Sequence, residues 1–522
     1  MLLDLPEELI SLVFSWVDGR SLVRCQQVSR QCARIIQRDL RLTYRINLFS
    51  ANMIDNTNHN ASLAERSACL KSFIKSREEG NWSTPKVLQS PFSHIPSYIV
   101  ANLESSQSWP ALSFSNLLVI SARTCLYCVD ASEVALGGEA HQRELRVAGF
   151  PTIPYFYIFP EHDLLLIKEL ELGQFIFHPF SLETGRSHPK ASGVLPPVVS
   201  PLAMSALNDF SLCGEYLLVW VDHGIRDPYF MKGRFTILNW TTGTIYRTIF
   251  GSYAAGAFLN TSHVICLHVT AEKSTGYLKF RLDVYSIHGQ SSDPPIICFE
   301  YPPIRSTTFP DVALLPPAIF LVNGSLSSTS TRGKRLPFVA SPEDSILMFC
   351  TQAHRRVSSP WEDLPWQLTS VFLISSILSR VRAAEATWDG QNTVTIPPNG
   401  WEHFTVPMWN EDVLYLYGTR MLVEREGSNV LTIYDFDRKS IAENGVGTAS
   451  SKSFTAPDVR DIPWVDVKQV DEVMPIPRVQ SFKLDVEPNS AVDLDLDEDT
   501  VMVLTEGRQG AFYVHSLVTS AS

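Results

Sequence analysis

From about residue 110 to its end, the sequence consists of short apolar runs separated by polar turns. Clear examples lie at residues 117–120, 164–167, 216–221 and 414–417. Runs of this length that are bounded by turn residues and rich in branched and aromatic side chains are typical of β-strands. Most of this chain of 522 residues must therefore fold into β-sheets.

The turns recur at a spacing that favours one β architecture. A strand, a polar turn and a second strand follow one another around Gly185, Gly243 and Gly289, at intervals of 58 and 46 residues. A propeller blade of four strands takes about 40–50 residues, so the segment holds about seven degenerate blades. The sequence thus predicts a mostly-β region over residues 106–522 that is a β-propeller, with two stacked β-sandwiches as the alternative.

Composition excludes several other classes of protein. Apolar residues make up 45% and charged residues 19%, so the chain is globular rather than disordered. Its net charge of −12 disfavours general binding of nucleic acid, which requires cations to neutralise phosphates. Nine scattered cysteines predict reduced thiols, and no apolar run reaches the length of about 18 residues that a membrane span needs. Because the acidic N-terminus is also unlike a signal peptide, we expect a cytoplasmic and/or nuclear protein without membrane contact.

The first 46 residues have a different periodicity, which is typical of short helices. Asp4 is expected to cap the first helix, the pair Asp18-Gly19 to end it, and Ser21 and Ser29 to cap a second and a third. The apolar positions of the first helix are Leu9, Ile10, Val13, Phe14 and Val17. A unit this small buries little apolar surface by itself, so these side chains pack on the rest of the chain or on a partner.

The order of these residues resembles an F-box without a gap from residue 5 to residue 35. The match comprises a Leu-Pro-x-Glu-Leu start, a Val-Ser-Arg triplet at 28–30 and the apolar positions between them; it departs at Cys32, where many F-boxes have Trp. The resemblance implies docking to the Skp-family adaptor of a cullin–RING ubiquitin ligase, with apolar helix faces inserted between adaptor helices. The adaptor-binding residues that it implies are Leu5, Pro6, Glu8, Leu9, Ile10, Val13, Phe14, Leu22, Val28 and Ser29. In the alternative reading some of the apolar residues, Val17 and Ile35 above all, only hold the helices together.

Five arginines follow one another near the end of this unit. They are Arg30, Arg34, Arg38, Arg41 and Arg45. Their spacings of 4, 4, 3 and 4 residues predict that all five lie along one face of the third helix. Such a face is a candidate basic contact ridge for an acidic partner, and a plain solvated helix face is the alternative.

The next segment, residues 47–105, is predicted to be a helical linker. It contains a helix over 61–80 with Leu63, Leu70, Phe73 and Ile74 as its apolar side, ended by Gly80. The predicted fold is therefore multi-domain: a small all-α F-box at 1–46, linker helices at 47–105 and the β-propeller at 106–522. Residues 360–366 resemble a segment of fungal F-box proteins whose C-terminal halves look propeller-like.

No motif in the sequence carries catalytic chemistry. Cys125-x-x-Cys128 has no second ligand pair for zinc, and Ser187-x-x-Lys190 lies in a Pro-rich loop. The acidic run at 493–499 lacks the glycine and the distal glutamate of a calcium loop. We therefore expect no catalytic residue, no cofactor and no metal.

These observations predict the non-catalytic substrate-recognition subunit of an SCF-type (Skp–cullin–F-box) ubiquitin ligase. The F-box would dock the adaptor, and through it a cullin, while the β domain would present an unknown target protein for ubiquitination. Two alternatives stay open: a non-degradative F-box scaffold, and a small-molecule-binding, sugar-binding or hydrolytic propeller with a structural helical cap.

Overall fold

The computed structural model describes about two thirds of the chain. The described residues are 5–56, 59–80, 86–89, 111–114, 117–121, 125–130, 141–150, 155–171, 174–199, 210–222, 233–251, 253–272, 277–301, 304–305, 321–323, 336–353, 366–388, 390–397, 404–409, 413–424, 430–437, 478–483, 491–496, 500–505 and 511–516.

The β region consists of antiparallel sheets whose strands follow one another along the chain. Sheet 1 contains β3 (Ala111–Phe114), β4 (Leu117–Ser121), β5 (Leu126–Asp130) and β6 (His141–Leu145). Sheet 2 contains β7 (Tyr155–Phe159), β8 (Leu164–Glu171), β9 (Gln174–Ser181) and β10 (Val198–Val199). Sheet 3 contains β11 (Phe210–Cys213), β12 (Tyr216–Asp222), β13 (Gly233–Asn239) and β14 (Thr244–Gly251).

The remaining sheets repeat this order, with two strands added to sheet 4 and with the outer strand of sheet 7 taken from earlier in the chain. Sheet 4 contains β15 (Tyr253–Phe258), β16 (His263–Glu272), β17 (Tyr277–Ser286) and β18 (Ile297–Glu300), joined by β19 (Ile304–Arg305) and β24 (Val394–Ile396). Sheet 5 contains β20 (Leu321–Asn323), β22 (Ile346–Ala353), β23 (Trp366–Leu373) and β25 (Phe404–Trp409). Sheet 6 contains β26 (Val413–Tyr417), β27 (Arg420–Glu424), β28 (Val430–Asp435) and β29 (Arg478–Lys483). Sheet 7 contains β30 (Ala491–Leu496), β31 (Thr500–Thr505), β32 (Ala511–Ser516) and β2 (Lys86–Gln89).

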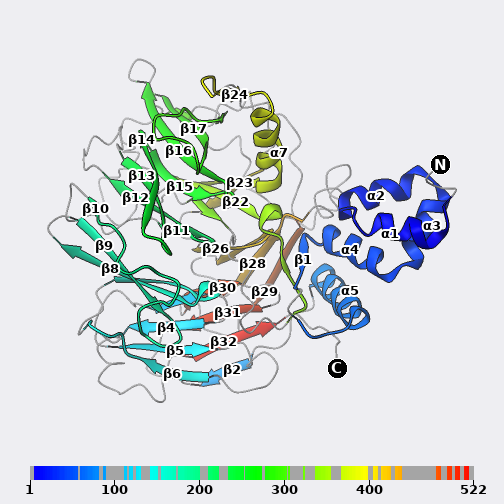
Figure 1. The fold of residues 1–522 in the computed structure, drawn as a ribbon. Coiled ribbons are helices and arrows are strands. Elements are labelled where there is room, and N and C mark those ends of the chain that lie inside the picture. The colour runs from blue at the N-terminus through cyan, green and yellow to red at the C-terminus, as the bar shows by residue number, and fades with distance from the viewer. Residues whose placement is uncertain are drawn as a thin grey trace.

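The first strands of the sheets meet around a ring (Figure 1). β3 contacts both β7 and β30, β15 contacts β11 and β20, and β26 contacts β20 and β30. The last sheet thus lies beside the first, and β2, from ahead of sheet 1, pairs with β32 as the outer strand of sheet 7. This is a β-propeller whose ring is closed by strands from both ends of the region. The described strands form seven sheets of this kind; about seven blades for the whole chain stays a prediction.

The strands lie where the apolar runs predict them. Each of the four runs falls within one strand: β4, β8, β12 and β26. Gly185 and Gly243 occupy turns with φ of 66° and 71°, a left-handed conformation that glycine adopts without strain. Along residues 164–167 of β8 and 216–221 of β12 the side chains of both faces are buried, those of each face in a different apolar cluster, which is why these two runs are continuous rather than alternating.

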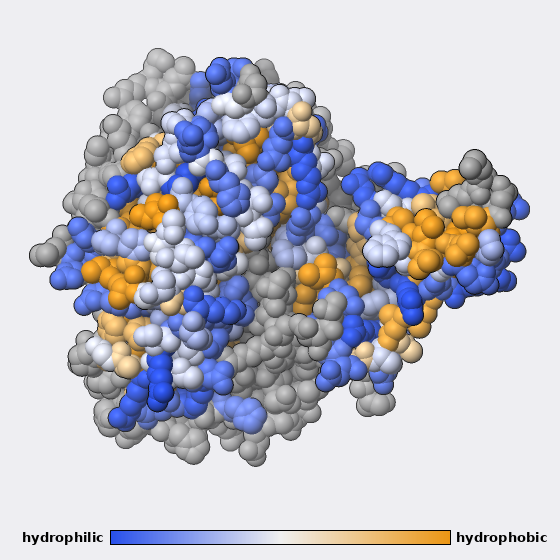
Figure 2. Space-filling view, in the orientation of Figure 1, coloured by the Kyte–Doolittle hydropathy of each residue, from blue (hydrophilic) through white to orange (hydrophobic). Residues whose placement is uncertain are grey.

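The first 50 residues form a helical unit that stands at one side of the propeller (Figures 1 and 2). It contains α1 (Glu7–Phe14), α2 (Gly19–Val28), α3 (Arg30–Arg38) and α4 (Leu40–Ser50). Its core consists of Ile10, Phe14, Leu22, Cys32, Ile35, Ile36 and Leu42. Three side chains cap its helices: Asp18 accepts from the N–H of Ser21, Ser29 from that of Cys32, and Asp39 from that of Arg41. The prediction that Ser29 is a cap is confirmed, and Asp4 lies outside the described residues.

The expected role of Asp18-Gly19 is wrong. α1 ends earlier, at Phe14, and Asp18 begins the next helix instead of ending the first. Asp18, not Ser21, is the cap of α2. Gly19 is needed for space: a Cβ there would lie 2.5 Å from the Cβ of Phe49 on α4. The glycine therefore allows two helices to approach closely, a requirement that local sequence does not reveal.

The prediction that one helix carries all five arginines is also wrong. The third helix ends at Arg38, and Asp39 takes an extended conformation with φ of −88° and ψ of 113°. Its carboxylate then caps α4, on which Arg41 and Arg45 lie. The spacing of the arginines continues across the break, but the helix axis does not.

The linker segment contains both helix and strand. α5 (Leu63–Glu79) confirms the helix predicted over 61–80, and Gly80 ends it with φ of 67°. A capping box between Ser62 and Glu65 begins it. The structure differs in that α4 runs to Ser50 and that β2 belongs to the propeller. Among the described residues no helix is both long and apolar enough to cross a membrane.

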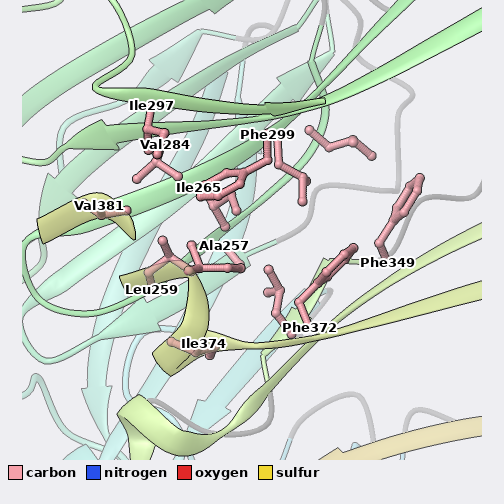
Figure 3. Packing of buried hydrophobic residues seen from close by; sticks show 14 of the residues in the cluster. Ala257, Leu259, Ile265, Val284, Ile297, Phe299, Phe349, Phe372, Ile374 and Val381 are labelled. Carbon is pink, nitrogen blue, oxygen red and sulfur yellow. The ribbon is translucent and has the colours of Figure 1, made fainter. Parts of the chain in front are cut away.

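An insertion in sheet 5 ties that sheet to its neighbour. Between β23 and β25 the chain forms α7 (Ile374–Glu385) and then β24, which pairs in parallel with β18 of sheet 4. Ile374 and Val381 of α7 point into the apolar core between the two sheets, together with Phe349 and Phe372 (Figure 3). On the polar side His263 Nε2 lies 2.8 Å from Glu385 Oε1. Sheets 4 and 5 are thus held by strand pairing as well as by packing.

Candidate partner-binding surface

Helix α1 has two apolar faces, of which only one is buried in the helical unit. Ile10 and Phe14 point into the core and are 0% and 2% exposed. The other face carries large apolar side chains in contact with water. We call these residues the α1 patch: Leu5, Leu9, Leu12, Val13 and Trp16. Leu9, Leu12 and Val13 repeat at intervals of three and four residues, so they form a second stripe along α1, which Leu5 before the helix and Trp16 after it extend.

The α1 patch is a marked departure from an ordinary surface. Trp16 is 86% exposed, the largest exposed fraction of the large hydrophobic residues described, and Val28 at the end of α2 is 77% exposed. Figure 2 shows hydrophobic side chains gathered on this face of the helical unit. Burying such side chains yields about 25 cal/mol for each Å² removed from water. A cluster of this kind is characteristic of a surface that binds another protein.

The residues for which the F-box resemblance implies adaptor binding fall into two groups in the structure, exposed and buried. Leu5, Pro6, Glu8, Leu9, Val13 and Val28 are exposed. Ile10, Phe14 and Leu22 are buried in the core of the unit, where Ile35 joins them, so they shape the surface without lining it. Ser29 caps α3 and is half-buried. That Val17 and Ile35 hold the helices together agrees with their places against this core.

Two exposed residues of the surface, Leu12 and Trp16, are absent from the set predicted from sequence. They lie three and seven residues after Leu9, so the helical spacing of the exposed stripe was present in the sequence. The exposed stripe could not be distinguished from the buried one in the sequence, because Ile10, Phe14 and Val17 repeat just as regularly. Periodicity alone does not tell which stripe faces the core.

The five arginines are exposed, but two of them also brace the helical unit. Arg45 donates through Nη1 to the carbonyl oxygens of Ser15 and Val17, at 2.5 Å and 2.9 Å. The guanidinium of Arg38 lies 3.6 Å from the carboxylate of Glu7. Arg45 thereby holds the end of α1, and with it the start of the loop that carries Trp16, against α4.

The helical unit meets the propeller through an apolar cluster. Tyr44 and Leu48 of α4 and Leu70 and Phe73 of α5 pack with buried residues of sheet 6 and of the segment between β20 and β22. The propeller side of this cluster consists of Leu336, Phe338, Ala340, Leu422, Leu431 and Ile433. The short strands β1 (Met53–Asp55) and β21 (Phe338–Ala340) pair across the same contact. The junction therefore resembles the interior of one domain.

Two polar groups of contacts complete this junction. Asp55 on β1 accepts from the Tyr44 hydroxyl at 2.9 Å and from Arg66 of α5 at 3.0 Å, so it joins three elements. On the propeller side, Arg77 of α5 is 5% exposed and forms a bidentate pair with Asp435, the last residue of β28. Burial lowers the pKa of Arg77, but the carboxylates of Asp435, Asp437 and Glu78 together raise it by more, so the guanidinium stays charged.

Among the described residues no group of three or more His, Cys, Asp or Glu side chains is placed to hold a metal ion. Cys125, just before β5, and Cys128, within it, are buried, and neither forms a disulfide. The side chains of the acidic run at 493–499 lie outside the described residues. A buried carboxylate that the sequence did not signal, Asp283, is neutralised by Arg281 at 2.6 Å.

Comparison with known proteins gives one match to a family model and several distant structural similarities. A model described as F-box-like matches residues 2–48. No curated protein matches the chain. The full extracellular region of plexin A4 has 11% identity and a TM-score of 0.39, over 84% of this chain and 40% of that one.

Two further solved structures are propellers by name. The β-propeller domain of the Trilobed protease from Pyrococcus furiosus has 8% identity and a TM-score of 0.36, over 79% of this chain and 97% of that one. The WD40 domain from Toxoplasma gondii coronin has 9% identity and a TM-score of 0.32, over 77% and 80%. This chain spans less than half of the plexin region. The assignment of the propeller rests on the pairing of its own strands, and residues 2–48 are F-box-like by sequence.

Proposed function

We propose that this protein is the substrate-recognition subunit of an SCF-type ubiquitin ligase. The observation that carries the proposal is the α1 patch, an exposed apolar helix face on a unit whose sequence is F-box-like. A face of this kind fits into a groove between the helices of a partner. The partner is a Skp-family adaptor, which links the chain to a cullin in the cytoplasm or nucleus.

The contribution of this chain to the reaction is proximity. The propeller holds a target protein, while the adaptor and cullin hold the ubiquitin-conjugating enzyme at the other end of the complex. Joining both in one assembly raises the effective concentration of a target lysine near the activated ubiquitin. No residue of the chain itself forms or breaks a bond in this function.

The test is co-purification of the full-length chain with a Skp-family adaptor. Leu9→Asp and Val28→Asp each place a charge where the adaptor supplies an apolar surface, so each should abolish co-purification. Both residues are exposed, so the variants should fold as the parent protein does. Phe250→Asp is the matched control, because it places the same charge at an exposed apolar residue of the propeller, on β14.

Adaptor binding by both helical variants at the level of the parent protein would contradict the proposed contact. Loss of binding by Phe250→Asp as well would indicate a general defect and not a lost docking face. A parent protein that binds adaptor but never directs ubiquitin to any bound protein would favour the non-degradative scaffold.

A further inference from the structure

Helix α5 and the end of the helical unit contact the propeller together, and this contact contains a buried cation, Arg77 of α5, with a specific set of partners. Arg77 Nε and Nη2 both donate to Asp435, and Nη2 also donates to Thr419 Oγ1 at 2.8 Å. Nη1 donates to the carbonyl oxygen of Ala51, just after α4, at 3.3 Å. A second carboxylate, that of Asp437, lies 3.6 Å from Nη2. One side chain thus joins α5, the end of α4 and two segments of sheet 6.

The contacts of Arg77 restrict the orientation of the helical unit relative to the propeller more strictly than the surrounding apolar cluster does. Apolar contacts are non-directional, so the buried cluster sets the orientation of the two units less strictly than a polar pair does. The three residue pairs of β1 and β21 are the other directional contact at this junction. A bidentate guanidinium–carboxylate pair has one favourable geometry, and moving either partner leaves a buried charge without its counter-ion. Arg77 and Asp435 are 358 residues apart in the sequence, so their pairing links the two units of the fold.

We propose that Arg77 is a positioning residue: its pairing with Asp435 and Asp437 fixes the direction in which the helical unit stands on the propeller. The orientation of the helical unit on the propeller can be measured in the isolated chain, without any partner protein. Its consequence for ubiquitin transfer rests on the proposed function, because a fixed orientation would then set which lysines face the conjugating enzyme.

The first experiment measures orientation in the isolated full-length chain. Spin labels are placed through non-canonical amino acids at the exposed positions Gln37 on α3 and Lys190 after β9, which leaves the cysteines untouched. Electron–electron double resonance then gives the distribution of distances between them. The test variant combines Arg77→Met, Asp435→Asn and Asp437→Asn, because removing the three charges together leaves neither carboxylate in the interior without Arg77. Arg420, which is buried opposite Asp435 across β27 and β28, keeps its charge.

We expect the triple variant to keep the Tm of the parent protein within a few degrees while its distance distribution becomes about twofold broader or shifts. Arg77→Lys keeps the charge but loses the bidentate geometry, so the width of its distance distribution should lie between those of the parent protein and the triple variant. Leu70→Ala is the matched control from the same junction: it removes buried apolar contact, so it should lower Tm and leave the distribution unchanged. A triple variant with the narrow distribution of the parent protein would overturn the proposal.

The second experiment separates this proposal from the proposed function. The parent protein and the triple variant are assembled with adaptor, cullin, conjugating enzyme and ubiquitin, and the lysines modified on the chain itself are mapped by mass spectrometry. We expect equal adaptor binding but a changed set of modified propeller lysines. Absence of adaptor binding by both proteins would refute the proposed function and leave the distance result standing. An unchanged set of modified lysines, alongside a broadened distribution, would overturn the link between orientation and transfer.

Discussion

At the scale of single residues, neighbouring apolar side chains of α1 have opposite roles. Phe14 is buried and holds the helices together, whereas Trp16, two positions later, is almost entirely exposed. Truncating Phe14 would cost about 3–5 kcal/mol of stability, as for other buried aromatic residues. Trp16 makes little contact with the folded unit, so its side chain is available for a contact outside the chain.

Trp16→Ala is therefore expected to weaken adaptor binding without unfolding the protein. Exposed tryptophans that become buried in an interface commonly contribute about 2 kcal/mol or more, which corresponds to at least a tenfold loss of affinity. Titration calorimetry with purified adaptor measures the affinity, and a thermal melt of the free chain should show an unchanged Tm. A lowered Tm with unchanged affinity would show that Trp16 stabilises the folded chain and does not contact the adaptor.

At the scale of elements, the helical unit depends on side-chain caps that are carboxylates. Asp39 caps α4 and accepts the hydroxyl of Ser11, which ties the helix start to α1. Burial raises its pKa, but hydrogen bonds from Ser11, Arg41 and Leu42 lower it by more, so the net pKa is lowered. The pKa of Asp18 at the start of α2 is lowered too, first through its bond from Ser21.

A lowered carboxyl pKa in the folded state stabilises the fold above the pKa of the unfolded chain, which is about 3.9 for Asp. This stabilisation is lost as the pH falls through the folded pKa. We expect the helical unit to lose stability below about pH 4, as measured by circular dichroism during urea titrations at several pH values. Asp39→Asn keeps a capping oxygen but does not titrate, so it should weaken this acid dependence, whereas Asp39→Ala should cost about 1 kcal/mol at neutral pH.

At the scale of the whole molecule, the boundary between the helical segment and the propeller is not a single point in the sequence. β2 lies ahead of sheet 1 but completes sheet 7, and α5 packs on sheet 6 and on the segment that contains β21. The propeller therefore includes residues from the segment that reads as a linker. Closing the ring with strands from both ends ties the N-terminal and C-terminal segments together.

A chain that begins at residue 110 should thus be damaged, although all later strands remain. It lacks β2, so the edge of β32 is left without its partner. We expect a lower Tm and aggregation on gel filtration relative to a chain that begins at residue 40, which keeps α4, α5 and β2. Equal Tm and equal monomer fractions for the two chains would show that β2 is dispensable for ring closure.

Features that depend on neighbours along the chain can be read from the amino-acid order. The strands at the four apolar runs, the α5 helix with its terminal Gly80, and the F-box-like order at residues 2–48 all follow from local periodicity and turn chemistry. Other features became visible only in the folded chain: which stripe of α1 is buried, that β2 and β24 join distant sheets, and that Arg77 pairs with Asp435. The physical reason is that local patterns report what each segment can form, whereas burial and ion pairing depend on what other segments bring to the same place.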